Sequence, residues 1–179
     1  MLTLPELGGL LNEPHRRDVL RLETLPRYRS ASDGEDFQRF LDGEAAPTVD
    51  KSGWRDLLGN ARARGCTWRR VRIVHDPITP YEAYSLAWGY PDSVRFGEQV
   101  RVRQSPPGKA VDQQVGDFFV LDGQDVIRSV YDADGWFQHA EPVTGPMRDV
   151  YVALAGLAWD TAEDFTTWWS RHHGEAQVA

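Results

Sequence analysis

Cysteine is almost absent from this sequence: Cys66 is the only one among 179 residues. An internal disulfide needs two cysteines, so a disulfide framework is excluded and a reducing cytoplasm is the expected location. No run of about 18 apolar residues occurs, so a membrane-spanning helix is not expected. Residues 1–11 are mildly apolar but carry no basic segment, which does not fit a secretion signal.

Sequence motifs that are typical of known catalytic or cofactor-binding sites are missing as well. The chain has no Gly-x-Gly-x-x-Gly, no Walker loop, no Gly-x-Ser-x-Gly and no His-Glu-x-x-His. His172 and His173 are adjacent, whereas two metal ligands on a helix need a spacing of three or four residues. We therefore expect no metal and no cofactor, and the sequence favours a protein that is not an enzyme.

Acidic residues outnumber basic residues, 27 to 20. The formal net charge is −7 at pH 7 and the isoelectric point is about 5.2. Binding to nucleic-acid phosphates or to an anionic membrane requires a basic surface. The net negative charge therefore argues against direct contact with nucleic acid or membrane, although it still allows a local basic patch.

The pattern of apolar residues predicts one α+β domain over residues 19–171, with a flexible arm at 1–18 and a frayed tail at 172–179. Helical spacing predicts helices over residues 34–41, 52–64, 79–88, 146–159 and 160–171. Alternation and Asp-Gly turns predict strands over residues 67–75, 99–104, 117–121, 126–131 and 136–140. We expect an antiparallel sheet of about five strands packed with N-terminal, inserted and C-terminal helices.

Apolar stripes that we expect to be buried run along the predicted helices. In the helix over residues 34–41 the stripe consists of Phe37, Phe40 and Leu41. In the helix over residues 146–159 it consists of Val150, Leu154, Leu157 and Ala158.

The strand over residues 67–75 has two different faces. Val71 and Ile73 point one way, whereas Arg70 and Arg72 point the other way. The strand over residues 99–104 alternates in the same manner, with Arg101 and Arg103 on one face. If the two strands are neighbours, we expect the four arginines to lie on one side of the sheet, about 5 Å apart.

Four guanidinium groups this close repel one another unless negative charge lies nearby. A bound phosphate, carboxylate or acidic peptide would supply it from outside, and the nearby aromatic residues Trp68, Tyr81 and Tyr84 would form the walls of the site. Two other interpretations stay open: the arginines form internal salt bridges or face solvent, and the aromatic residues belong to the core. Candidate internal partners are Glu82, Glu98, Asp117 and Glu141.

His75 offers an alternative hypothesis, an enzyme acting on an anionic, phosphate-containing substrate with this histidine as acid or base. Asp76 is adjacent in sequence, but neighbouring strand residues point to opposite faces, so the two do not form a natural pair. Convergence of His75 with the arginines in one pocket would support this hypothesis.

Seven segments, taken in order, resemble an actinobacterial family catalogued as domain of unknown function 6879. They are Leu22-Glu23-Thr24-Leu25-Pro26-Arg27-Tyr28, Trp54, residues 65–74, Pro77-Ile78-Thr79-Pro80-Tyr81, residues 97–102, residues 117–122 and Tyr131-Asp132-Ala133-Asp134-Gly135. The resemblance covers roughly residues 20–170. Family members are often encoded near helix-turn-helix regulators, which implies a cytoplasmic accessory or regulatory role, with such a regulator or another protein as partner.

The chain departs from the family at one position. Members commonly have an arginine in the helix after the Thr-x-Tyr turn, where this chain has Tyr81-Glu82-Ala83-Tyr84. An anion site shared by the family would be weaker here.

The leading hypothesis is thus a non-enzymatic cytoplasmic binding protein that recognises a partner protein or a small acidic ligand. Its predicted contact residues are Arg70, Arg72, Arg101, Arg103, Trp68, Tyr81 and Tyr84. The alternatives are the enzyme described above and a toxin–antitoxin component acting on nucleic acid, against which the acidic charge argues.

Overall fold

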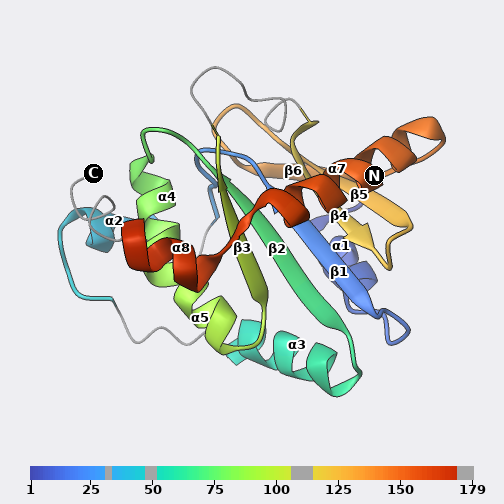
Figure 1. Ribbon diagram of the computed structural model, residues 1–179, viewed down its shortest axis with the longest axis horizontal. Coiled ribbons are helices and arrows are strands. Elements are labelled where there is room, and N and C mark those ends of the chain that lie inside the picture. The colour runs from blue at the N-terminus through green and yellow to red at the C-terminus, as the bar shows by residue number, and fades with distance from the viewer. Residues whose placement is uncertain (31–33, 47–51, 106–114, 173–179) are drawn as a thin grey trace.

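A seven-stranded mixed sheet forms the centre of the computed structural model, which describes residues 1–30, 34–46, 52–105 and 115–172 (Figure 1). The strand order is β6-β5-β4-β1-β2-β3-β7. The strands are β1 Asp18–Glu23, β2 Thr67–Val74, β3 Gln99–Gln104, β4 Asp117–Leu121, β5 Asp125–Tyr131, β6 Phe137–Val143 and β7 Glu163–Asp164. The helices are α1 Leu4–Leu11, α2 Gly34–Leu41, α3 Ser52–Ala63, α4 Pro80–Tyr84, a π-helical turn Ser85–Gly89, α5 Tyr90–Arg95, α7 Pro146–Thr161 and α8 Phe165–His172.

The expected antiparallel sheet of about five strands is wrong, because the sheet has seven strands and β1, β2 and β3 run parallel. Helices separate these three strands in sequence, and a helical crossover returns the chain to the end of the sheet from which it started. The antiparallel meander β4-β5-β6 agrees with the prediction. Its first turn, which connects β4 to β5 through residues 122–124, places both Asp122 and Gly123 at positive φ, and the Gln124 amide donates to the main-chain oxygen of Leu121 at 3.0 Å.

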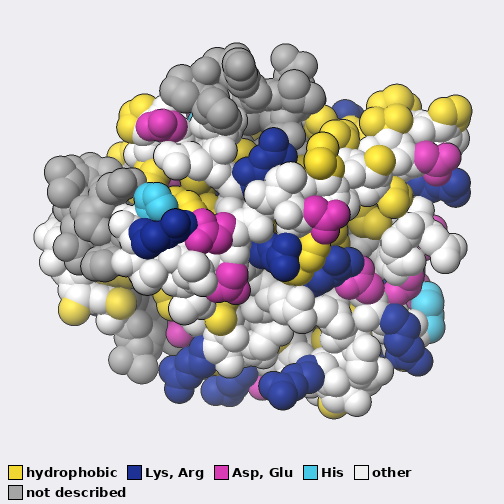
Figure 2. Space-filling view, viewed as in Figure 1, with side chains coloured by type: hydrophobic (Ala, Val, Ile, Leu, Met, Phe, Trp, Pro, Cys, Tyr) yellow, Lys and Arg dark blue, Asp and Glu magenta, His cyan; other side chains and the backbone are white. Residues whose placement is uncertain are grey.

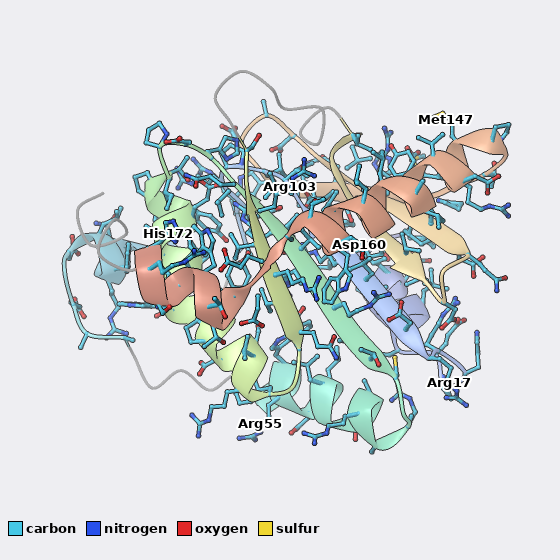
Figure 3. The ribbon with its side chains drawn as sticks, viewed as in Figure 1. Arg17, Arg55, Arg103, Met147, Asp160 and His172 are labelled. Atoms are coloured by element: carbon cyan, nitrogen blue, oxygen red, sulfur yellow. The ribbon has the colours of Figure 1, made fainter. Side chains whose placement is uncertain are left out.

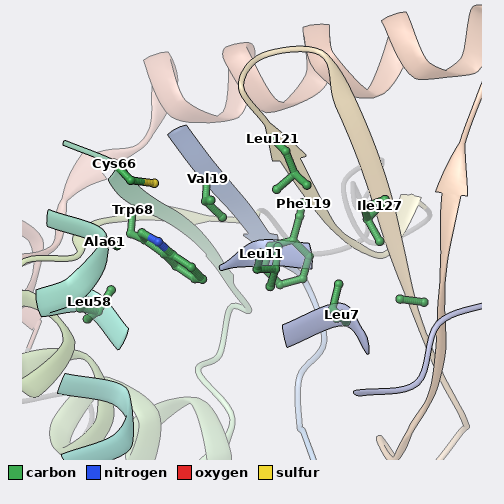
Figure 4. Close-up of a cluster of buried hydrophobic side chains, with 11 residues drawn as sticks. Leu7, Leu11, Val19, Leu58, Ala61, Cys66, Trp68, Phe119, Leu121 and Ile127 are labelled. Carbon is green, nitrogen blue, oxygen red and sulfur yellow. The ribbon is translucent and has the colours of Figure 1, made fainter. Parts of the chain in front are cut away.

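The N-terminal segment contributes to the core, although a flexible arm was expected there. Helix α1 begins with a capping box in which Thr3 and Glu6 satisfy each other's backbone amides. Leu7 and Leu11 are buried against one face of the sheet, together with residues of α3, β1, β2 and β4 (Figure 4). The following strand β1 lies near the middle of the sheet, between β4 and β2.

Helix α7 covers the opposite face of the sheet (Figure 1). It buries Tyr151, Ala155 and Ala158. The expected stripe was wrong for two of its members, because Val150 and Leu157 are exposed. Exposed apolar side chains of α7 give the yellow patch at the upper right of Figure 2, near Met147 as labelled in Figure 3. No helix in the described ranges is long and apolar enough to cross a bilayer.

A buried charge network beneath an aromatic cover

The register between β2 and β3 decides which arginines share a face. The two strands are neighbours, as expected, but Arg70 pairs with Val100 and Arg72 pairs with Val102. Paired residues in a parallel sheet point to the same side, so Arg101 and Arg103 lie on the face opposite to Arg70 and Arg72. The prediction of a single four-arginine face is therefore wrong.

Arg101 belongs to the α7 side of the sheet. Its Nη1 donates to the main-chain oxygen of Trp159 at 2.6 Å, and its guanidinium lies 4.2 Å from the centre of the Trp159 ring. Arg69, which is paired with Asp18, approaches the same ring at 5.0 Å. Arg103 is at the upper end of β3 (Figure 3). The two β3 arginines thus form no common site with Arg70 and Arg72 of β2.

Arg70 is buried and neutralised from inside the chain. Its Nε donates to Glu98 at 2.8 Å, and its Nη1 donates to both carboxylate oxygens of Glu23 at 3.1 and 3.2 Å. The hydroxyl of Tyr90 also donates to Glu23, at 2.7 Å. This arginine therefore connects β1, β2 and the segment before β3 through charge-assisted hydrogen bonds.

Arg72 is completely buried, with 0% of its surface exposed. Its Nη2 donates to the main-chain oxygen of Leu25 at 2.6 Å and to Oε1 of Glu82 at 3.2 Å, and its Nη1 donates to the hydroxyl of Tyr28 at 3.3 Å. Glu82 is also completely buried. Arg72 thereby fixes the segment after β1 and the start of α4 on the same strand.

A third arginine completes the network on the β1–β4 side. Arg21 approaches Glu23 at 2.9 Å and Asp117 at 3.9 Å. Asp117 accepts hydrogen bonds from the amide of Thr24 at 2.8 Å and from the hydroxyl of Tyr28 at 2.6 Å. Tyr28 therefore links Asp117 to Arg72, and the network is continuous from β4 to α4.

The network contains three guanidinium groups, Arg21, Arg70 and Arg72, and four carboxyl groups, Glu23, Glu82, Glu98 and Asp117. Burial by itself would raise the pKa of Glu23, but Arg21, Arg70 and Arg72 outweigh it and lower the pKa to about 2. Burial raises the pKa of Asp117 above its usual value, against the opposing charge of Arg21. Compensation thus comes from within the chain, so an external anion is not needed to hold the arginines.

Sequence reasoning identified part of this network. Glu82, Glu98 and Asp117 were among the four candidate partners, whereas the fourth, Glu141, pairs with Arg128 instead. Glu23 was missed, because β1 was not recognised as a strand beside β2. The alternation in Leu20-Arg21-Leu22-Glu23 was the signal that could have revealed it.

His75 has a carboxylate partner, but not the neighbour in sequence. Its Nδ1 lies 2.7 Å from Oε1 of Glu82, which also accepts from the His75 amide at 3.1 Å. Glu82 caps α4 by accepting from the Thr79 amide at 2.9 Å. The sequence signal was the capping box Thr79-x-x-Glu82 directly after β2. Such a pair can orient the imidazole ring of His75, and the His75 side chain is 24% exposed.

The three predicted wall residues are separated by the fold. Trp68 is 4% exposed and packs edge-on against Trp54 in the core beside α3 (Figure 4). Tyr81 and Tyr84 lie together on α4 with their ring centres 5.6 Å apart, and Trp88 follows 5.8 Å from Tyr84. We call Tyr81, Tyr84 and Trp88 the aromatic wall.

Helix α2 covers the aromatic wall. The ring of Phe37 lies 5.4 Å from Tyr81 and 5.5 Å from Tyr84, centre to centre. The ring of Phe40 lies 5.8 Å from Tyr84 and 5.5 Å from Trp88. No residue of α2 is fully buried, and Leu41, which was expected inside, is exposed.

A family model described as "Domain of unknown function (DUF6879)" matches residues 6–170. The chain belongs to this family. No curated protein and no solved structure matches it. The match covers the whole charge network and the aromatic wall, so both lie inside the DUF6879 domain. Within its described residues, this domain brings no three His, Cys, Asp or Glu side chains together as a metal-binding group.

The segment between β1 and α2 is locked to the turn between β5 and β6 in this DUF6879 domain. Gly135 has φ +89°, and a Cβ atom there would lie 2.6 Å from the main-chain oxygen of Arg27. We expect Gly135→Ala to destabilise the domain by about 1–3 kcal/mol, because it adds a main-chain clash to an unfavourable backbone conformation.

Gly123→Ala is the matched control for this prediction. Gly123 has φ +69°, but its Cβ would meet no atom within 4 Å. Chemical denaturation of both variants should give a larger loss for Gly135→Ala. Equal losses would show that the close approach to Arg27 has no energetic weight.

Proposed function

We propose that this DUF6879 domain is a non-enzymatic, cytoplasmic binding protein that recognises a partner protein through its aromatic wall. The observation that supports this function is the contact with α2, a helix without a fully buried residue that is held on the wall by Phe37 and Phe40. A surface that accepts an amphipathic helix from its own chain has the chemistry to accept one from another protein. Tyrosine and tryptophan are also the side chains most often found in the centres of interfaces.

The charge network provides the base of this surface in our proposal. Glu82 caps the helix that carries Tyr81 and Tyr84, and Arg72 holds Glu82. Thr79, the cap residue, donates to the main-chain oxygen of Pro26 at 2.8 Å. A site on a helix fixed in this way loses little conformational freedom on binding, which favours affinity.

The predicted contact residues receive different roles in this proposal. Tyr81 and Tyr84 touch the partner, and Trp88 joins them. Arg70 and Arg72 are structural, because both are buried and bonded to carboxylates. Arg101, Arg103 and Trp68 lie outside the contact, and a small acidic ligand on the arginines is not proposed.

The His75–Glu82 pair supports the enzyme hypothesis, whereas the pairing of Arg72 with the same carboxylate argues against an anion-binding site there. Arg72 and His75 converge on the same oxygen of Glu82, at 3.2 and 2.7 Å. The carboxylate therefore occupies the position that a substrate anion would need. We retain the binding function for this reason.

The test is affinity purification from the native host, followed by quantitative mass spectrometry, with wild type and Tyr84→Ser. We expect a protein that is enriched about tenfold or more with wild type to be lost with the variant, since a hot-spot aromatic residue typically contributes more than 1.4 kcal/mol. A helix-turn-helix regulator is the expected class of partner from the family resemblance. Binding of the purified partner is then measured by titration calorimetry.

Leu157→Ser is the control, because Leu157 is 56% exposed on α7, on the opposite face of the sheet. It should retain the partner. Circular dichroism checks that both variants are folded. Retention of every enriched protein by folded Tyr84→Ser would refute the proposed function.

A further inference from the structure

Helix α2 packs on α4, and its attachment differs from that of the helices that contribute to the core clusters. Helices α1, α3, α5, α7 and α8 each place at least one side chain in a buried core cluster, whereas α2 places none there. The polar contacts of its side chains with described residues stay within residues 36–44: Gln38 with Asp42, and Arg39 with Asp36 and Glu44. Among the described residues, the Phe37 and Phe40 rings hold α2 on the aromatic wall, and Arg27 lies over the ring of Phe37.

A helix of eight residues is marginal on its own, because few hydrogen bonds follow the costly first turn. Elements with few buried apolar contacts open at a lower free energy than the core. The surface beneath α2 is, in contrast, firmly attached to the rest of the domain. Tyr81 and Tyr84 lie on α4, whose Glu82 is completely buried and bonded to Arg72, and the Tyr81 ring lies 6.0 Å from the ring of Tyr28 in the charge network. Opening of α2 would leave the aromatic wall in place.

We infer that α2 is an intramolecular cover that competes with the partner for the aromatic wall. This inference rests on the proposed function and specifies the partner: it presents an amphipathic helix with two aromatic side chains three residues apart, as Phe37 and Phe40 are in α2. The first turn of that helix carries acidic residues, as Glu35 and Asp36 do in α2. Arg27 favours this arrangement, because its guanidinium lies 5.3 Å from the centre of the Phe37 ring at this end of the wall.

The test uses the full chain and a fluorescein-labelled synthetic peptide with the sequence of residues 34–44. Fluorescence anisotropy gives its dissociation constant for wild type, for Phe37→Ser/Phe40→Ser, and for that variant with Tyr84→Ser added. If the cover is open less than about a tenth of the time, wild type should bind the peptide about tenfold or more weakly than the double variant. Adding Tyr84→Ser should remove this gain. A peptide with both phenylalanines replaced by serine is the control and should not bind.

Hydrogen exchange of the wild type provides a readout that does not depend on peptide affinity. We expect the amides of α2 to exchange at least about 100-fold faster than those of β2, since local opening requires less free energy than global unfolding. Equal protection of α2 and β2 would overturn the inference. Equal peptide affinity of wild type and the double variant would also overturn it.

The two proposals fail in different ways. If α2 is a cover, Phe37→Ser/Phe40→Ser should bind the native partner more tightly than wild type does. Unchanged partner affinity in this variant, combined with loss of the partner by folded Tyr84→Ser, would refute the cover and leave a partner that binds the aromatic wall beside α2, at the half-buried Trp88. Retention of the partner by Tyr84→Ser refutes the proposed function itself.

Discussion

Arg72→Met is expected to lower the free energy of unfolding by about 3–5 kcal/mol, the usual cost of removing one partner from a buried ion pair. The variant leaves Glu82 completely buried without its guanidinium partner. It also deprives the main-chain oxygen of Leu25 of its donor at 2.6 Å. Urea denaturation monitored by circular dichroism measures this loss.

A second substitution identifies the cause. Glu82→Gln added to Arg72→Met removes the unpaired charge but keeps only one acceptor oxygen, so it can accept from the His75 amide or from the Thr79 amide, which donate to different oxygens of Glu82. We expect it to restore about 1–3 kcal/mol, as coupled neighbours do in double-mutant cycles. If Glu82→Gln restores nothing, the uncompensated charge is not the cause.

Arg148→Met is the matched control, because Arg148 is half exposed on α7 and pairs only with its neighbour Asp149 among the described residues. Its stability should stay within about 0.5 kcal/mol of wild type. If Arg72→Met were as stable as this control and lost only partner binding, Arg72 would be a binding residue and the structural role assigned to it would be wrong.

Acid is expected to remove about 3 kcal/mol of stability through Glu23 alone, since its pKa in an unfolded chain is about 4.3. In the folded domain the pKa is about 2, because three arginines overcome the effect of burial. A depressed carboxyl pKa stabilises the folded state above the unfolded pKa. This contribution is lost as pH falls from about 5 through 2. Asp117 acts in the opposite direction, because its raised pKa means that protonation favours the folded state.

The measurement is the unfolding free energy of wild type and Glu23→Gln from pH 6 to pH 2. Effects of the other carboxyl groups are shared, so the difference between the two curves isolates Glu23. We expect the advantage of wild type to shrink steadily with falling pH. Glu141→Gln is the comparison variant: Arg128 also lowers the pKa of Glu141, but this carboxylate is partly exposed outside the network, so the advantage of wild type over Glu141→Gln should shrink less. Parallel curves for wild type and Glu23→Gln would contradict the depressed pKa.

Local chemistry made several elements predictable. Strand β3 has the predicted bounds, residues 99–104, and strand β4 has the predicted bounds, residues 117–121. Thr79 and Pro80 start α4 as expected, because the cap and the proline act within one turn. The end of this region was wrong: a helix ending at Trp88 was expected, whereas the chain continues through a π-helical turn into α5, which ends at Arg95. The structure describes the chain up to His172, so the prediction about the adjacent pair His172 and His173 lies partly outside the described residues.

The site was less predictable than the elements. Arg70 and Arg72 were recognised from their alternation on β2, whereas Arg21 was missed together with its strand β1. The face that two strands share depends on their register. That register is set by packing across the sheet, where a shift of one residue exchanges the two faces. The aromatic wall was recognised in part from Tyr81 and Tyr84. Its cover was not, because a contact between α2 and α4 joins segments about 45 residues apart, and no local pattern encodes it.

Short-range periodicity and turn chemistry were enough to predict the α+β class, the antiparallel meander at its Asp-Gly turns, and the unusual arginine pair on β2. Tertiary structure decided that β1, β2 and β3 run parallel, that Arg70 and Arg72 are neutralised by Glu23, Glu98 and Glu82, and that α2 lies on the aromatic wall. A buried guanidinium needs acceptors and a compensating negative charge, and here the carboxylates that supply the charge come from strands and helices distant in sequence.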